Sequence, residues 1–133
     1  MNKIRIAGIV DDDPIVIFGM KLMLKQVDAD LQTHVWNNGQ EAIEGLKALV
    51  ENGKPLPDVI FLDLTMPIMD GWDFLDALQK ATLPGKEKMR IFVLSSSINP
   101  VDRERALENK EVIDFIVKPL KEARLKEILS LAS

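Results

Sequence analysis

Acidic side chains stand directly after two apolar runs of this chain, at places where an ionised carboxylate is costly to desolvate. Asp11 and Asp12 follow the run that ends at Val10, and Asp63 follows Val59-Ile60-Phe61-Leu62. Carboxylates that gather at one place repel one another unless a cation intervenes. The chain has no cysteine and one histidine, so oxygen ligands for a hard cation are the metal chemistry that fits. Magnesium suits such a set, because it binds carboxylates, a backbone carbonyl and phosphate oxygens in a near-octahedral shell.

A carboxylate at such a place can also act as a nucleophile toward phosphorus and form an aspartyl phosphate. This chemistry needs a metal and an amine that neutralise the phosphoryl oxygens, and Lys118 supplies a compact positive charge after the run "VIDFIV". Ser95, the first of three serines after "RIFVL", supplies a hydroxyl group. Taken singly, Asp63 fits a turn residue, Lys118 a solvated lysine and Ser95 a loop residue. Their joint placement after separate apolar runs favours a shared site.

The third aspartate of the run "DDD" has a different predicted role. Asp13 precedes Pro14, and an aspartate followed by a proline is typical of the first residues of a helix. We therefore assign Asp13 to helix capping and leave the other two aspartates for the site. The same pattern recurs at Asn99-Pro100, with Asp102 in the first turn, where the helix dipole favours an acid.

Short β-rich runs alternate with longer amphipathic stretches along the chain, which predicts a parallel sheet with crossover helices. We expect strands over residues 4–10, 33–36, 58–62, 90–95 and 112–117. We expect helices over residues 14–27, 40–51, 71–80, 100–109 and 121–131. In the first of these helices, the apolar stripe is predicted to be Ile15, Phe18, Leu22 and Val27. In an open sheet of this kind, ligands bind outside the carboxyl ends of the strands, which is where the acids, the hydroxyl and the amine are expected.

Length and composition limit the possible functions. With 133 residues and 47% hydrophobic content, the chain fits one folded domain over residues 1–133. A net charge of -4 argues for a soluble protein and against nucleic-acid binding, which needs a basic surface. The start "MNKIRIAGIV" reads as a strand rather than a signal peptide, and no apolar run is long enough to cross a membrane. The absence of cysteine excludes disulfides and fits a reducing cytosol.

The segments "VDDDP", "FLDLTMPIMDG", "FVLSS" and "DFIVKP", in this order and at these separations, closely resemble the receiver domain of two-component response regulators. The likeness covers the chain from about Lys3 to Leu131 and is specific as a combination. It implies the fold of the chemotaxis response regulator. That fold is flavodoxin-like and doubly wound, a (βα)5 arrangement of five parallel strands in the order 2-1-3-4-5 with helices on both faces.

The resemblance also implies a role for each site residue. Asp63 would be the phosphoacceptor, and Asp12 would bind Mg²⁺ directly, whereas Asp11 would bind it through water. The backbone carbonyl of Thr65 would be a further metal ligand. The hydroxyl of Ser95 and the amine of Lys118 would contact the phosphoryl group. Pro119 would follow a cis peptide bond, and Phe115 would be an aromatic switch residue. Thr65 and Ser97 would occupy two positions that affect the rate of phosphoryl loss. The chain has no tyrosine, so a switch that depends on a hydroxyl group at Phe115 is excluded.

A stand-alone receiver domain is thus the function that the resemblance implies. It would accept a phosphoryl group from a histidine kinase or histidine phosphotransfer protein and catalyse only its own phosphorylation and dephosphorylation. The surface formed by residues 100–109, 112–117 and 121–131 would bind a downstream protein partner. We expect a cytoplasmic protein that is a monomer or a weak, phosphorylation-linked dimer.

Three other functions fit the sequence less well. A magnesium-dependent phosphatase with an aspartyl nucleophile typically has a second aspartate two residues later, where this chain has Thr65. A flavin-binding domain needs a phosphate loop after the first strand, and "DDDP" would repel the phosphate. A receiver domain that serves only as a scaffold tends to lose the acids or the lysine, which are all present here. We do not expect a phosphohistidine at His34, which lies in the middle of an expected strand.

Overall fold

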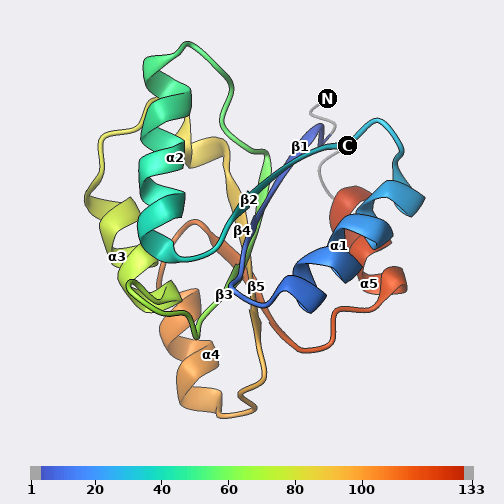
Figure 1. The fold of residues 1–133 in the computed structure, drawn as a ribbon. Helices are drawn as coiled ribbons and strands as arrows, with labels where there is room; N and C mark the ends of the chain where they lie inside the picture. The colour runs from blue at the N-terminus through green and yellow to red at the C-terminus, as the bar shows by residue number, and fades with distance from the viewer. Residues whose placement is uncertain (1–3, 131–133) are drawn as a thin grey trace.

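Strands and helices alternate along the whole of residues 4–130, the part of the chain that the computed structural model describes (Figure 1). The strands are β1 (Ile6–Val10), β2 (Gln32–Trp36), β3 (Val59–Asp63), β4 (Arg90–Ser95) and β5 (Val112–Val117). The helices are α1 (Pro14–Val27), α2 (Gly39–Glu51), α3 (Gly71–Lys80), α4 (Pro100–Leu107) and α5 (Glu122–Ser130). A short 3₁₀ helix, η1 (Lys86–Lys88), precedes β4.

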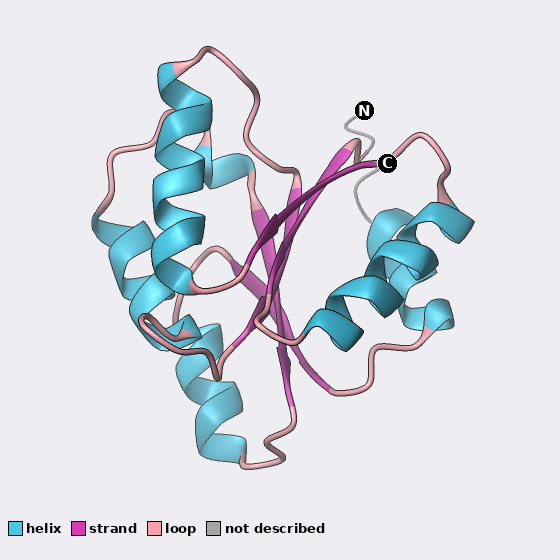
Figure 2. Ribbon diagram, in the orientation of Figure 1, coloured by secondary structure: helices cyan, strands magenta, loops and turns pink. Residues whose placement is uncertain are grey.

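The five strands form one parallel sheet in the order β2-β1-β3-β4-β5, as predicted. Helices α1 and α5 cover one face of this sheet and α2, α3 and α4 cover the other (Figures 1 and 2). Each face has its own apolar core. Buried helix residues contribute Met20, Leu24, Leu125 and Ile128 to the first core, and Ala42, Leu46, Phe74, Leu78 and Ala106 to the second.

The central strands are apolar on both faces because helices cover both sides of the sheet. All five residues of β1 and all five of β3 are buried. Since β1 pairs with β3 in parallel, both strands end at the same edge of the sheet. The strand order reverses between them, because the chain passes from β1 outward to β2 and then returns to β3 on the other side. This switch point is where doubly wound sheets bind their ligands.

Side-chain caps fix the start of four helices. The carboxylate of Asp13 accepts a hydrogen bond from the N–H of Ile15, and Pro14 is the first residue of α1, as predicted. Asn99 caps α4 in the same way ahead of Pro100, which confirms the second predicted cap. The caps of the other two helices are Asn38 and Asp70.

The predicted apolar stripe of α1 is wrong at three of its four residues, whereas the fourth, Val27, packs against the core. Ile15 is 80% exposed, Phe18 67% and Leu22 46%, whereas Met20 and Leu24 are the residues that α1 buries. The reason is that α1 is apolar around most of its circumference, so helical spacing alone allows two stripes, and the packing against β1 and α5 selects the other one.

Several element boundaries differ by one or two residues from the prediction. β1 starts at Ile6, and β3 extends through Asp63, which is therefore the last residue of the strand. α4 ends at Leu107, because Glu108 caps it and the side chain of Asn109 accepts a hydrogen bond from the N–H of Glu111. The predicted end of the last helix, Leu131, lies outside the described residues. Among residues 4–130, no helix has the length and apolar character that a membrane crossing requires.

Asp114 on β5 ties three elements together. Its carboxylate accepts hydrogen bonds from Arg103 of α4 at 3.2 Å and from Arg124 of α5 at 2.8 Å. Arg103 also donates to the backbone carbonyl of Phe115 at 3.0 Å, and the N–H of Phe115 donates to the Asp114 carboxylate at 2.8 Å. These pairs are partly exposed to solvent, so they orient α4 and α5 on the edge strand more than they stabilise the fold.

Candidate functional site

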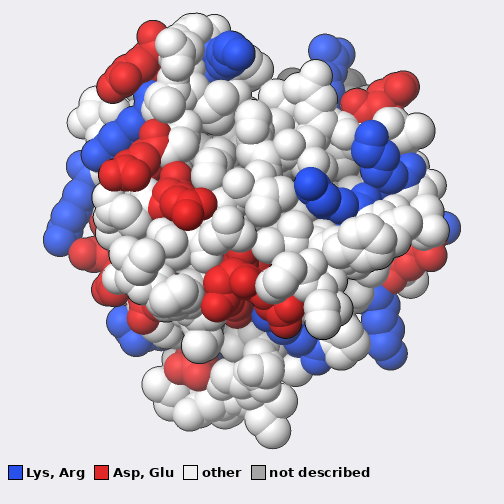
Figure 3. All heavy atoms as spheres, in the orientation of Figure 1, with Lys and Arg blue, Asp and Glu red and all other residues white. Residues whose placement is uncertain are grey.

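Three carboxylates meet at the carboxyl edge of the sheet. Oxygen atoms of Asp11, Asp12 and Asp63 all lie within 4.8 Å of one another. Asp11 and Asp63 are 2% and 8% exposed, whereas Asp12 faces solvent. At the place where Figure 1 has the ends of β1 and β3, Figure 3 shows a group of Asp and Glu side chains with uncharged side chains beside it. The structure thus brings together the three acids that the sequence had placed at this edge.

Lys118 lies opposite these acids and contacts two of them. Its Nζ is 3.4 Å from Asp11 Oδ2 and 3.3 Å from Asp63 Oδ1. Its backbone N–H donates to the carbonyl of Ser95 at 2.8 Å, and this hydrogen bond joins the ends of β4 and β5. The peptide bond between Lys118 and Pro119 is cis, which confirms that expectation. The site therefore has three carboxylates and one ammonium group, and it retains an excess of negative charge for a cation.

The environment of Asp63 raises the pKa of its carboxyl group above the ordinary value. Burial is the main cause and the neighbouring charge of Asp11 is the second. The ammonium of Lys118 and a hydrogen bond from the N–H of Thr65, at 3.4 Å, act in the opposite direction without cancelling the first two. A further positive charge near Asp63 would lower this pKa and favour the ionised nucleophile.

His34 lies outside this site, in the middle of β2. Its ring stacks on Trp36 with centroids 5.5 Å apart. Burial lowers the pKa of His34, and the nearby charge of Lys54 lowers it further.

The end of β2 and the loop after it form hydrogen bonds with the backbone of Asp11. The sequence did not predict this contribution to the site. The backbone N–H of Asp11 donates to the Trp36 carbonyl at 3.0 Å, and the side chain of Asn37 donates to the Asp11 carbonyl at 3.5 Å. The next residue, Asn38, is buried and caps α2. The uncharged end of β2 gave no chemical signal, although two successive asparagines before a helix are a capping signal.

Ser95 is buried at the end of β4, the strand next to β3, and belongs to a chain of hydrogen bonds toward α4. Its Oγ accepts the N–H of Ser97 at 3.0 Å, and the hydroxyl of Ser97 donates to Asp102 at 2.6 Å. A cavity at this place has Thr65, Ser95, Ser97, Asp102 and Trp72 among its lining residues. This cavity lies between the loop that follows Asp63 and the first turn of α4.

Phe115, the expected aromatic switch residue, is buried. Its side chain is only 4% exposed and packs in the apolar core. A phenyl ring has no hydroxyl group to hydrate, so the buried position is the favourable one for it. A ring with a hydroxyl group would have a reason to stay at the surface.

The donor set fits a hard divalent cation. Two buried carboxylates and one exposed carboxylate, with no thiolate or imidazole beside them, are the oxygen ligands that Mg²⁺ or Mn²⁺ prefers. The open side at Asp12 leaves room for water and for phosphoryl oxygens. Thr65 is exposed next to this set, and the role of its carbonyl as a ligand stays a prediction.

Comparison with known proteins gives a consistent picture. A family model described as the response regulator receiver domain matches residues 7–130. The chemotaxis protein CheY of Listeria monocytogenes is 34% identical over 114 residues, which are 86% of this chain and 89% of that protein. A two-component response regulator from Cytophaga hutchinsonii has a similar structure, with a TM-score of 0.88 and 28% identity over 98% of this chain and 97% of that chain.

A second similar structure is bound to a partner. It is a chain of the CheX-CheY-BeF3-Mg+2 complex from Borrelia burgdorferi, with a TM-score of 0.77 and 25% identity over 96% of this chain and 88% of that chain. Receiver domains of the CheY type are in general signalling modules rather than enzymes. The matches over nearly the whole described chain show that it belongs to the response regulator receiver domain family, which acts in phosphorylation-dependent two-component signalling.

Proposed function

We propose that Asp63 is the phosphoacceptor of this receiver domain, and that a histidine kinase or histidine phosphotransfer protein supplies the phosphoryl group. The observation that carries this proposal is the ammonium of Lys118, which lies 3.3 Å from Asp63 and 3.4 Å from Asp11 at the edge of the sheet. It offers one positive charge to a phosphoryl group that arrives at Asp63.

The transfer step forms one bond and breaks another. A carboxylate oxygen of Asp63 bonds to phosphorus while the bond from phosphorus to the donor's imidazole nitrogen breaks, and the imidazole leaves with the electron pair. Lys118 neutralises a phosphoryl oxygen, and the hydroxyl of Ser95 donates a hydrogen bond to another. When bound, Mg²⁺ supplies positive charge to the phosphoryl oxygens.

We assign the metal site to the carboxylates of Asp11, Asp12 and Asp63 and to the backbone carbonyl of Thr65. The spacing of the three carboxylates supports the assignment, and the similar Borrelia burgdorferi complex contains Mg²⁺ together with BeF3. Asp12 is the most accessible of the three, so it is the direct ligand, and Asp11 acts through water.

The output of the switch is proposed to be a protein-binding surface on α4, β5 and α5. The chain would act in the cytoplasm as a single receiver domain, a monomer or a weak, phosphorylation-linked dimer. It would catalyse its own phosphorylation and dephosphorylation and no reaction of another substrate. The position where a phosphatase would have its second aspartate is Thr65.

The test is phosphorylation by a small donor. Wild type incubated with acetyl phosphate and Mg²⁺ should gain the mass of one phosphoryl group, and it should gain none when a chelator removes the metal. Asp63→Asn should stay unlabelled under both conditions. Intact-mass spectrometry measures the label, and equal labelling of both proteins would show that the phosphoacceptor is another residue.

A further inference from the structure

β2 forms one edge of the sheet, and part of its backbone points away from the other strands. The N–H of Gln32 and the carbonyl of Trp36 each form a hydrogen bond of 3.0 Å on the β1 side. Successive residues of a strand direct their backbone groups to alternate sides. The N–H and carbonyl groups of Thr33 and Val35 therefore point outward, where the described part of the chain has no further strand.

β2 lacks the features that usually keep an edge strand from pairing with another chain. Residues 31–40, "LQTHVWNNGQ", contain no Asp, Glu, Lys, Arg or Pro, in a chain that is 29% charged. The strand also has no bulge, since it pairs with β1 in one register over all its residues. At the place where Figure 1 has the middle of β2, Figure 3 shows uncharged side chains. An extended chain could therefore pair with β2 without burying a charged side chain of this strand.

β5, the other edge strand, is less open to such pairing. The carbonyl and the N–H of Phe115 already bond the side chains of Arg103 and Asp114. The register of β5 against β4 also shifts between Ile91 and Phe92. The available edge of a second molecule is thus its own β2. Two identical strands that pair in antiparallel directions form a closed two-fold dimer.

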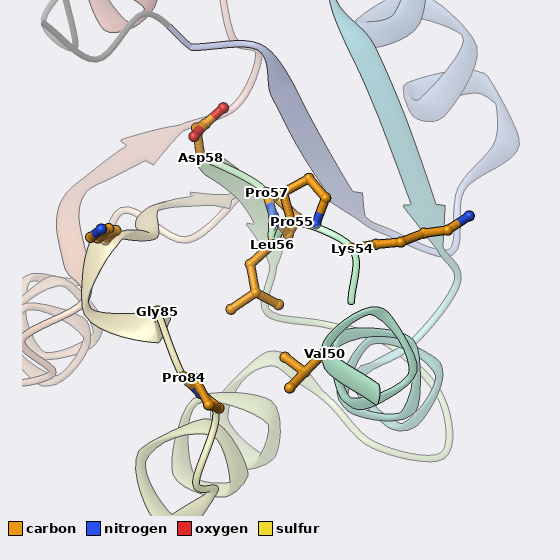
Figure 4. Close-up of a pocket in the computed structure, with 9 residues that line it drawn as sticks. Val50, Lys54, Pro55, Leu56, Pro57, Asp58, Pro84 and Gly85 are labelled. Atoms are coloured by element: carbon orange, nitrogen blue, oxygen red, sulfur yellow. The ribbon is translucent and has the colours of Figure 1, made fainter. Parts of the chain in front are cut away.

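His34 is the middle residue of β2, and its surroundings keep it uncharged. Its ring stacks on Trp36, and burial and the nearby charge of Lys54 lower its pKa. Figure 4 shows how this lysine is placed: Val50 and Leu56 point into a pocket of about 420 Å³, and Lys54 points away from them. His34 is therefore neutral at neutral pH, and two copies of it can face each other without charge repulsion.

We infer that two copies of this protein pair through β2, in antiparallel directions and with their His34 residues opposite each other at the two-fold axis. In this register, Thr33 of each copy lies opposite Val35 of the other, and each of these pairs exchanges two backbone hydrogen bonds. The two sheets then form one continuous sheet. Because β5 lies at the far edge, the pairing leaves the proposed output surface free and needs no phosphorylation.

The absence of cysteine allows a direct test of this register. His34→Cys places one thiol at the two-fold axis, where facing Cα atoms are about 4.5 Å apart, a distance that a disulfide can span. Thr33→Cys is the matched control on the same strand, because its two copies lie two residues out of register and too far apart for a disulfide. Under mild oxidation with copper phenanthroline, His34→Cys should form a covalent dimer at least about tenfold faster than Thr33→Cys. Non-reducing electrophoresis measures both rates.

A charge on the edge of β2 should prevent the pairing. Sedimentation velocity over a concentration series should show a weak monomer–dimer equilibrium for wild type, because one pair of strands buries little surface. Thr33→Lys should raise the dissociation constant about tenfold or more, since its ammonium would face Val35 of the second copy. Two controls should have the wild-type constant: Thr33→Val stays uncharged and branched at Cβ, and Ile113→Lys puts the same charge on β5. Melting curves show whether each variant is folded.

The inference fails if His34→Cys cross-links no faster than Thr33→Cys, whatever the sedimentation result. It also fails if dimerisation requires BeF3 and Mg²⁺, or if Ile113→Lys weakens the dimer as much as Thr33→Lys does. Either result would assign the contact to the surface of α4, β5 and α5. The pairing does not involve Asp63, so a failure of acetyl phosphate to label that residue would contradict the proposed function and not this inference.

Discussion

At Asp63, burial and charge oppose the ionised form that would attack phosphorus. Burial and the charge of Asp11 raise the pKa of its carboxyl group, and Lys118 only partly offsets them. A carboxyl group whose pKa is raised by folding stabilises the protein below its unfolded pKa, and this contribution is lost as the pH rises through the folded pKa. At neutral pH and without metal, the ionised Asp63 therefore lowers the free energy of unfolding.

The raised pKa of Asp63 predicts how Asp63→Asn changes the stability of the protein. In a chelator at neutral pH the variant should melt above wild type, and the difference should shrink as the pH falls toward the ordinary aspartate value of 3.8. Added Mg²⁺ should raise the melting temperature of wild type more than that of the variant, because the cation binds the ionised carboxylate. Melting curves followed by circular dichroism test both statements. A variant that melts below wild type at every pH in the chelator would contradict this account.

The consecutive aspartates allow a second test. Asp12→Ala should weaken Mg²⁺ binding far more than Asp13→Ala, because Asp12 belongs to the carboxylate cluster whereas Asp13 caps α1. Asp13→Ala should instead lower the free energy of unfolding by about 1 kcal/mol, the usual loss for a missing cap. Magnesium titration followed by tryptophan fluorescence and thermal melts of each variant separate the two effects. If Asp13→Ala lost the metal and kept its melting temperature, this division of the triplet would be wrong.

The sequence was informative about these residues because each stands at the end of a strand or shortly after it. Asp63 and Lys118 could be assigned to one edge from the apolar runs before them, and the structure does bring them within 3.3 Å. The hydrogen bond from Asn37 to Asp11 and the positive φ of Ile68 could not be predicted from the sequence. Both depend on how separate loops bond to each other. The buried position of Phe115 also depends on tertiary packing rather than on local pattern.

At the scale of helices, substitution of two glycines by alanine is expected to change stability in opposite directions. A Cβ atom at Gly45 of α2 would clash with the indole ring of Trp36, whereas nothing lies within 4 Å of a Cβ atom at Gly19 of α1. Gly45→Ala should lower the free energy of unfolding by about 1–3 kcal/mol, because the indole has to move. Gly19→Ala should raise it by about 0.5–1 kcal/mol, because alanine is the better helix former.

Urea denaturation of the two variants and of wild type measures these changes. The pair is matched, since both substitutions add one methyl group in the middle of a helix. If both variants were stabilised, the packing of Trp36 against α2 would differ from the structure described here.

Helix order and strand order were predictable, but the orientation of a helix about its axis was not. The stripe of α2 is unambiguous because charged residues occupy its outer face, and Ala42, Ile43 and Leu46 are buried. In α1 the apolar residues extend around the helix, so the choice between Leu22 and Leu24 as the buried leucine depended on the neighbours.

For the whole molecule, the question is how phosphorylation at Asp63 reaches α4 and β5. A phosphoryl group offers a strong acceptor to the hydroxyl of Ser95, whose Oγ already accepts a hydrogen bond from Ser97. Ser97 in turn bonds Asp102 in the first turn of α4. Since Phe115 is already buried, phosphorylation would stabilise this arrangement rather than move the ring across the sheet edge.

NMR spectra with BeF3 and Mg²⁺ test this relay. Chemical-shift changes should extend from Asp63 through Ser95 to Phe115 and to residues 100–109. Ser95→Ala should confine the changes to the metal-binding loops, because it removes the hydroxyl group that bonds Ser97 and that is proposed to contact the phosphoryl group on Asp63. Changes confined to those loops in wild type, or an unchanged spread in Ser95→Ala, would reject the relay.

The contacts of Asp114 and Arg103 have a consequence for behaviour at high concentration. β5 is an edge strand, and the outer amides of edge strands are the groups through which proteins add strands from other molecules and aggregate. At Phe115 both outer groups are occupied, the N–H by the Asp114 carboxylate and the carbonyl by Arg103. A strand from a second molecule would have to displace two charged side chains before it could pair there. Loss of either side chain would therefore expose an aggregation-prone edge. The resulting aggregation would appear at high protein concentration and not in the melting curve of a dilute sample.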